Sequence, residues 1–369
     1  MKTAIITTTI NIPTLLKDYA KNAQDYGHQD LFFVVIGDKK SPPDTHKFCS
    51  MLQTKFNYPV YYQDIDIQFN YLERFPKLWE HLPFNSIQRR NIGLLFAYER
   101  GADIIITIDD DNLVISEQDF VGSHSIIGME RELISYSSKT GWLNICEFLQ
   151  EANNNCFYHR GYPSSQKGRA GESNFIKEKI KGKVVVNAGL WLDDPDVDAV
   201  SRLNYPVRAT WMKAEYAPTA ALGKGTWSPF NSQNTALSRE VLPAYFLSPY
   251  IGRYDDIWAS YIVKKVADHL GHFVTCGYPL VRQIRNPHDI WKDLDKEREG
   301  SKLTDRFTDI LRKIRLTQQD YHGCFKEIVR DLNQEFSNDK LFGPEEITFL
   351  QKFREGLEIW SETFEIINK

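Results

Sequence analysis

Three adjacent acidic residues, Asp109, Asp110 and Asp111, are the side chains of this sequence best suited to chemistry. They directly follow Ile104–Ile108, an apolar run typical of a buried strand in a parallel sheet. The acids therefore come at the carboxyl end of that strand, where open α/β sheets bind ligands. Burying these carboxylates without partners would cost several kcal/mol.

A divalent cation would resolve the repulsion among the three carboxylates. Mg²⁺ and Mn²⁺ take carboxylate oxygens and fill their remaining positions with water and substrate phosphate. Strand alternation would put Asp109 and Asp111 on one face and Asp110 on the other. We therefore expect Asp109 and Asp111 to bind Mn²⁺ or Mg²⁺, directly or through water. A solvated acidic turn after a strand is the alternative.

The segment before this strand predicts the helix that positions it. Residues 87–100 are amphipathic, with Ile92, Leu95 and Phe96 at helical spacing and Gly101 as a C-cap. An Arg-Asn-x-Gly helix, a glycine stop, an apolar strand and an acidic cluster together resemble the nucleotide-sugar domain of GT-A glycosyltransferases.

The amino-terminal segments alternate between strand and helix patterns. Strands are predicted at residues 3–9, 31–36 and 59–63, and Pro13 opens a helix that continues to about Tyr26. This rhythm predicts an α/β fold, a GT-A-like (Rossmann-like), mostly parallel sheet flanked by helices.

Several residues of this region are candidates for binding a nucleotide sugar. In GT-A folds the residue after the second strand often holds the base, so the Asp38 carboxylate is a candidate to accept the uracil imide N–H; an ordinary turn aspartate is the alternative. Arg90 is a candidate for the donor diphosphate, for pairing with the acidic cluster, or for a helix surface. The complete set of predicted nucleotide-sugar contacts is Thr8, Asp38, Arg90, Asp110 and Arg253.

Composition excludes some classes of protein. The 369 residues carry a formal net charge of −4, which argues against a general nucleic-acid surface. The five cysteines include no C-x-x-C spacing, which argues against a zinc ribbon and a disulfide framework. We expect no transmembrane helix and no signal peptide, and therefore a cytoplasmic protein.

The rest of the chain is predicted in broader terms. Residues 120–155 are expected to hold one strand and one helix (Trp142–Asn153), and residues 183–192 another strand. One helix is predicted from Asp255 to about Leu270, and three more over residues 303–316, 319–336 and 344–367. We therefore predict a catalytic domain over residues 1–300 and a C-terminal helical region over 301–369, a bundle or an oligomer surface.

Two further acidic segments attract attention. Residues 193–199 carry four aspartates and could form a second metal site, but a solvated turn is the favoured interpretation. Asp255 and Asp256 open a helix, where the dipole alone favours acids. Many GT-A enzymes present an acidic pair at this point, where it holds the acceptor or acts as a base.

Over roughly residues 85–300 the chain resembles the reversibly glycosylated polypeptides, which include the plant UDP-arabinopyranose mutases. The resemblance rests on Asp109–Asp111, Arg160-Gly161-Tyr162-Pro163, Gly189-Leu190-Trp191-Leu192, Pro195–Ala199, Ile251–Trp258 and Asp268–Gly271. It implies a UDP-sugar, a divalent metal, and either interconversion of pyranose and furanose forms of a UDP-pentose or self-glycosylation.

The resemblance also implies that Arg160 is catalytic, and the acidic pair of GT-A enzymes makes Asp255 and Asp256 the other catalytic candidates. In the family the arginine of the RGYP segment is the self-glycosylation site. A guanidinium stays protonated, so Arg160 could instead clamp the diphosphate. If Arg160 were the nucleophile, Asp255 or Asp256 would have to accept a proton from it.

The chain also departs from the family pattern. It has Asn112 in place of the cysteine after the triplet, and Arg282-Gln283 where the family has a histidine. His288 is the candidate substitute as a metal ligand; the alternative is a metal with no third protein ligand.

Two other functions stay open beside the UDP-sugar mutase. One is a conventional GT-A glycosyltransferase that moves a sugar to a small-molecule, glycan or lipid-linked acceptor. The other is a non-catalytic partner subunit that binds nucleotide sugar. A homo-oligomer is compatible with each of them.

Overall fold

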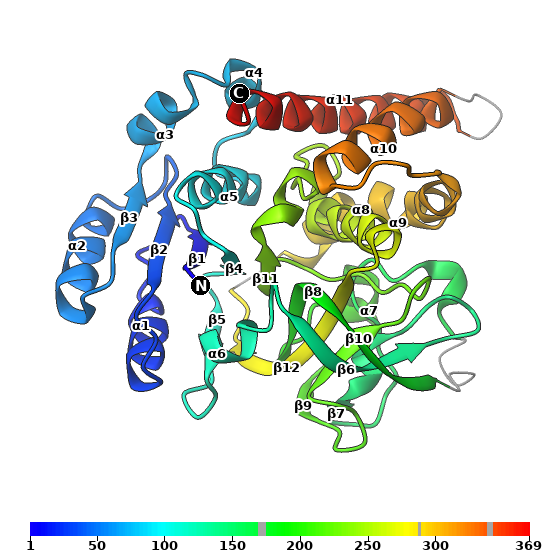
Figure 1. Ribbon diagram of the computed structural model, residues 1–369, viewed down its shortest axis with the longest axis horizontal. Helices are drawn as coiled ribbons and strands as arrows, with labels where there is room; N and C mark the ends of the chain where they lie inside the picture. Colours follow the sequence, from blue (N-terminus) through cyan, green and yellow to red (C-terminus); the bar gives the residue numbers. More distant parts are fainter. Residues whose placement is uncertain (169–174, 287–288, 338–341) are drawn as a thin grey trace.

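Four parallel strands form one side of the sheet in the computed structural model, which describes residues 1–168, 175–286, 289–337 and 342–369 (Figure 1). Their order is β3-β2-β1-β4 and all their pairings are parallel. The strands are β1 (Thr3–Thr8), β2 (Leu31–Ile36), β3 (Val60–Gln63) and β4 (Ile104–Ile108). Nearly all side chains of the three central strands are buried, as expected for strands covered on both faces. The predicted strands of this region are confirmed.

Helices connect these strands and pack beside them. They are α1 (Leu16–Asp25), α2 (Asp44–Phe56), α3 (Ile65–Leu72), α4 (Pro76–His81), the 3-10 turn η1 (Ile87–Arg89) and α5 (Arg90–Glu99). The helix predicted at residues 87–100 is therefore η1 continued by α5. A Cβ at Gly93 would lie 2.7 Å from Cγ2 of Ile6, so glycine lets α5 cross β1 closely. This contact explains the glycine of the Arg-Asn-x-Gly pattern.

Beyond β4 the sheet becomes mixed rather than mostly parallel. β11 (Asn234–Ser238) runs antiparallel to β4 and to the long β8 (Ile176–Asp193). β8, β6 (Glu130–Ser137), β10 (Thr219–Leu222) and β12 (Phe273–Gln283) pair in a closed ring. Antiparallel neighbours need no helical crossover, and the alternation of strands and helices stops in this part of the chain. Shorter strands complete the sheet: β5 (Asn112–Val114), β7 (Leu149–Glu151) and β9 (Ala209–Met212).

The helix predicted over Trp142–Asn153 is wrong. The segment holds a 3-10 turn η2 (Ile145–Phe148) and then β7, which pairs with β9. The Asn144 side chain accepts from the backbone N–H of Cys146 at 3.2 Å and donates to the carbonyl of Phe157 at 2.8 Å. Asparagine that binds the backbone in this way competes with helix, and the strand pairing then fixes the extended form.

The remaining helices include the predicted C-terminal ones. They are α6 (Phe120–His124), η3 (Ser164–Gln166), α7 (Ala199–Asn204), η5 (Arg239–Ala244), η6 (Gly252–Tyr254), α8 (Asp255–Leu270), α9 (Ile290–Lys313), α10 (Tyr321–Phe336) and α11 (Pro344–Ile367). In Figure 1, α11 lies along α10 and reaches α4. None of the described helices is long and apolar enough to cross a membrane.

α9 begins at Ile290 rather than at Leu303, because Asp289 caps its first turn. The helix packs on α8, where Trp258 stacks on Phe307 with ring centroids 4.2 Å apart. α9 thus runs across residue 300, and the division of the chain into two regions there stays a prediction.

Candidate functional site

A pocket of about 610 Å³ lies at the carboxyl ends of β1, β4 and β12 and at the start of α8. Eight of the residues predicted from the sequence line it: Thr8, Asp109, Asp110, Asp111, Arg160, Arg253, Asp255 and Asp256. Ser232 and Gln233, which directly precede β11, also line it. Ligand binding at the carboxyl ends of parallel strands is the expected position in an open α/β sheet.

The acidic triplet lies in a turn rather than in a strand. β4 ends at Ile108, so strand alternation does not govern Asp109–Asp111, and all three acids face the pocket. Asp110 accepts from Thr9 Oγ1 at 2.8 Å and from Asn286 Nδ2 at 3.2 Å. The expectation that Asp110 faces elsewhere is therefore wrong.

Several buried polar atoms of this pocket have no hydrogen-bond partner in the protein, although Nε of Arg285 is in an ion pair with Asp194. They are Thr8 Oγ1, Asp111 Oδ1, Gln283 Oε1, and Nε and Nη2 of Arg285. Burial and the neighbouring Asp109 raise the pKa of Asp111 to about 6. Buried polar groups are nearly always hydrogen-bonded, so a cluster of acceptors and donors without hydrogen-bond partners in the protein indicates that water or a ligand completes their bonding.

The oxygens of this cluster fit a divalent metal. Asp111 Oδ1 and Gln283 Oε1 are hard donors, and Gln283 pairs in register with Asn112, next to the triplet. Within the described ranges, no group of three or more His, Cys, Asp or Glu side chains could hold a metal ion. A metal here would therefore take much of its shell from water and substrate phosphates, as Mg²⁺ usually does. His288, the suggested substitute ligand, lies outside the described residues.

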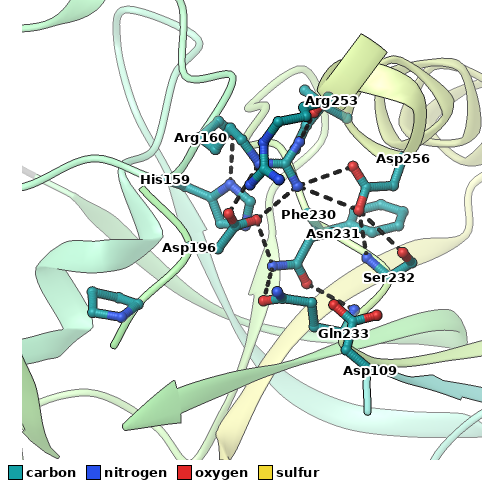
Figure 2. A network of polar contacts seen from close by, with 12 residues as sticks. Asp109, His159, Arg160, Asp196, Phe230, Asn231, Ser232, Gln233, Arg253 and Asp256 are labelled. Carbon is teal, nitrogen blue, oxygen red and sulfur yellow. Dashed lines mark hydrogen bonds and ion pairs between the residues drawn. The ribbon is translucent and has the colours of Figure 1, made fainter. Parts of the chain in front are cut away.

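Figure 2 shows Arg160 held between two carboxylates. Its Nε and Nη2 each donate to one carboxylate oxygen of Asp196 at 2.9 Å, and Nη2 also donates to Asp256 Oδ1 at 3.2 Å. Nη1 donates to the backbone carbonyl of Arg253. Burial alone would lower the pKa of Arg160, but Asp196 and Asp256 outweigh it and hold that pKa well above its usual value. The guanidinium therefore stays charged and is almost fully occupied by protein groups.

Asp196 is a site residue that the favoured interpretation of residues 193–199 missed. It is 1% exposed, whereas a solvated turn was expected. Burial would raise its pKa, but Arg160 and His159 lower it below its usual range. Asn231 Nδ2 also donates to Asp196 Oδ2 at 2.8 Å. The sequence feature that could have identified Asp196 is the Pro195–Ala199 segment of the family resemblance. The spacing of its acidic residues alone does not distinguish a buried site from a solvated turn.

The two aspartates that open α8 have different surroundings. Asp256 Oδ2 accepts from the backbone N–H of Ser232 at 3.0 Å and from its Oγ at 3.1 Å, and Asp256 also contacts Arg160. Asp255 Oδ2 accepts from Gln88 Nε2 at 2.7 Å. Burial and the neighbouring Asp256 raise the pKa of Asp255 to about 7. Asp255 can therefore both give and take a proton near neutral pH.

Arg90 and Asp38 are not among the residues that line the pocket. Arg90 is fully buried and its Nη2 lies 2.5 Å from Asp109 Oδ1, which is the pairing with the acidic cluster that the sequence allowed. Asp38 accepts from the backbone N–H of Ser86 at 3.3 Å and lies 3.9 Å from Arg89. The roles of Arg90 at the diphosphate and of Asp38 at uracil stay predictions.

Gly161 fixes the backbone next to Arg160, and its replacement offers a first test. Its φ is +79°, and a Cβ there would lie 2.2 Å from Cγ2 of Ile257 on α8. We expect Gly161→Ala to lower the free energy of unfolding by about 2–5 kcal/mol in urea titrations, through backbone strain and overpacking together. Gly168→Ala is the matched control, since its φ of +82° is similar but nothing lies within 4 Å of the added Cβ. Equal losses in the two variants would contradict the packing argument.

Comparison with known proteins finds a family model, curated proteins and solved structures that are similar to this chain. The model of the family described as reversibly glycosylated polypeptide matches residues 32–368. UDP-arabinopyranose mutase 1 of Arabidopsis thaliana is 26% identical over 274 residues, which cover 72% of this chain and 69% of that protein. Probable UDP-arabinopyranose mutase 1 of Pisum sativum is 26% identical over 277 residues, with 72% and 68% covered. The crystal structure of glucosyl-3-phosphoglycerate synthase from Mycobacterium tuberculosis in complex with uridine diphosphate aligns with a TM-score of 0.40 and 13% identity, over 86% of this chain and 84% of that one.

Proposed function

The chain belongs to the reversibly glycosylated polypeptide family, and on that premise we propose that it is a UDP-sugar enzyme that interconverts the pyranose and furanose forms of a UDP-pentose. The observation that carries this proposal is Asp255, a buried carboxyl with a pKa near 7 in the same pocket as the acidic triplet. Self-glycosylation is compatible with the same pocket.

The reaction requires one proton to be given and one to be taken. When a pyranose becomes a furanose, the old ring oxygen becomes a hydroxyl and gains a proton. A different hydroxyl closes the new ring and loses a proton. A single group with a pKa near the working pH serves both steps, and Asp255 fulfils that condition. Gln88 orients it through the hydrogen bond to Oδ2.

The bond between C1 of the sugar and the diphosphate must also break and form again. A bound Mn²⁺ or Mg²⁺ supplies charge neutralisation to the diphosphate as it leaves. We propose that Asp111 and Gln283 hold this ion together with Asp109. The Arg90 ion pair fixes the orientation of Asp109.

In this proposal Arg160 is first of all a positioning residue. It fixes Asp256 next to Asp255 and ties the Asp196 segment to the start of α8. As a nucleophile it would have to lose a proton, and Asp196 and Asp256 are the carboxylates already in contact to accept it. Intact-mass measurement under turnover distinguishes the two roles, since only the nucleophile acquires a sugar adduct. The UDP-sugar, any acceptor, the oligomeric state and the cytoplasmic location stay predictions from the sequence.

A chromatographic assay tests the proposed reaction directly. The purified protein is incubated with Mn²⁺ and a panel of UDP-sugars without acceptor, and the nucleotide sugars are separated. We expect a new isomer of unchanged mass, and we expect Asp111→Asn to remove it because the ligand cluster loses a charged oxygen. Asp25→Asn, at an exposed ion pair with Lys21, is the control and should leave the isomer in place.

Other outcomes of this assay support the other functions. UDP released only after an acceptor extract is added would identify a conventional glycosyltransferase. UDP-sugar binding without any turnover would identify a partner subunit.

A further inference from the structure

Arg285 is held beside the acidic triplet by the backbone on both sides of it. The N–H of Ile284 donates to the carbonyl of Asp111 at 3.2 Å, and the N–H of Asn286 donates to Asp111 Oδ2 at 3.3 Å. Arg285 lies between these two contacts and lines the pocket. Its position is thus fixed relative to Asp111, on the loop that follows β12.

The guanidinium of Arg285 is buried but poorly satisfied. The side chain is 10% exposed, and its Nε and Nη2 are buried without a hydrogen-bond partner. Its Nε forms an ion pair with Asp194, whose Oδ2 lies 3.3 Å away, and Asp194 is itself bound by Arg202. A buried donor without a partner costs free energy, so this arrangement is unfavourable unless a ligand completes it.

The other cations of the pocket are differently placed. Arg160 is occupied by Asp196 and Asp256, and Arg253 Nε donates to Glu297 at 2.9 Å. Lys296 is exposed, so its ammonium is hydrated. Among the described residues that line the pocket, Arg285 is therefore the largely buried cation that keeps an N–H group, at Nη2, with neither a hydrogen bond nor an ion pair.

We infer that Arg285 binds the diphosphate of the nucleotide sugar through its guanidinium, whose Nη2 has no protein partner, on the side of the pocket next to Asp111. The inference rests on the proposed function for the identity of the ligand. Two N–H groups of one guanidinium match two oxygens of a phosphate group, which an ammonium cannot reproduce. The free acceptors of Asp111 and Gln283 lie on neighbouring residues, so one diphosphate can contact Arg285 and a metal held by those oxygens. Arg285 therefore recognises the leaving group rather than the base or the sugar.

Binding titrations with fragments of the ligand test this assignment. UDP, inorganic pyrophosphate and uridine are titrated into the full chain in Mn²⁺. We expect Arg285→Gln to weaken binding of UDP and pyrophosphate by about 10- to 100-fold, the worth of one or two charge-assisted hydrogen bonds, and to leave uridine binding unchanged. Arg285→Lys should restore only part of the loss. Arg282→Gln is the control, because Arg282 is exposed and forms an ion pair with Asp193.

Thermal unfolding separates ligand binding from a structural role. Without ligand, Arg285→Gln should be at least as stable as the wild type, since it removes a buried, poorly paired charge. The increase in Tm that UDP gives the wild type should be largely lost. The assignment is overturned if Arg285→Gln has a lower Tm without ligand, loses uridine affinity equally, or keeps its affinity for UDP and pyrophosphate. It is also overturned if the wild type binds neither UDP nor pyrophosphate. A wild type that binds UDP through Arg285 but isomerises no UDP-sugar would reject the proposed function alone.

Discussion

Asp255→Asn is expected to slow UDP-sugar isomerisation by about 10²–10⁴-fold, the usual contribution of a general acid–base group. Asparagine keeps the size of the side chain and can still bind Gln88 Nε2 through its amide oxygen. It cannot exchange a proton, and the reaction moves one proton from a hydroxyl to the former ring oxygen. UDP affinity should change little, because Arg285 and the acidic triplet are untouched. Steady-state rates from the isomer assay, with UDP titration alongside, measure both quantities.

The same substitution should change how stability depends on pH. The pKa of Asp255 is about 7 in the folded protein, against an ordinary value of 3.8 for an aspartate in the unfolded chain. When the pH lies between these two pKa values, the folded state binds more protons than the unfolded state. The contribution of Asp255 to the free energy of unfolding therefore falls as pH rises from about 4 to about 7, and it is level above that. Asp255→Asn should remove this contribution and be more stable than the wild type at pH 8. Urea titrations at pH 5 and pH 8 test the sign.

Two results would contradict this role of Asp255. One is a variant that isomerises at the wild-type rate. The other is a stability difference between wild type and variant that does not change between pH 5 and pH 8. Asp25→Asn serves as control in both measurements, because its carboxylate is about half exposed in an ion pair with Lys21.

Local patterns predicted the parallel strands and the acidic triplet because the information lies in adjacent residues. Ile104–Ile108 reads as a buried strand whatever surrounds it, and Asp109–Asp111 must then come at its carboxyl end. The mixed side of the sheet depends instead on pairings between distant segments, such as β7 with β9. Such pairings override local preference, which is why the helix predicted over Trp142–Asn153 became a 3-10 turn and a strand.

The site residues that sequence patterns missed share one physical property. Asp196, Gln88 and Arg285 act through partners far away in the chain, for example Asp196 with Arg160 and Gln88 with Asp255. An aspartate after a proline, or an arginine after a strand, has the same local pattern in a turn and in a buried ion pair. Only the fold shows that Asp196 is buried away from solvent and that Arg285 lacks hydrogen-bond partners for part of its guanidinium.

Arg160→Met should lower the free energy of unfolding by about 3–5 kcal/mol and abolish isomerisation. The substitution leaves Asp196 and Asp256 buried, and it removes their shared cation and three of its hydrogen bonds to them. Arg285→Gln provides a contrast from the same pocket, because that arginine has no bidentate carboxylate partner and its loss should not destabilise the protein. Urea titrations of the two variants measure the difference.

A second substitution shows whether this loss comes from the buried carboxylates. In the Arg160→Met background, Asp196→Asn removes one of the two uncompensated charges, so it should recover part of the lost stability. In the wild-type background, Asp196→Asn alone should be destabilising. Activity should not return, because Asp256 is still unpaired and α8 no longer fixes Asp255 in the same way. If the double variant is less stable than Arg160→Met by the full effect of Asp196→Asn, the two residues are independent and the ion pair does not hold the site together. If the double variant is more stable than Arg160→Met, the charge of Arg160 is what allows Asp196 and Asp256 to be buried. Both then lie beside a third carboxyl, Asp255, that must still exchange a proton.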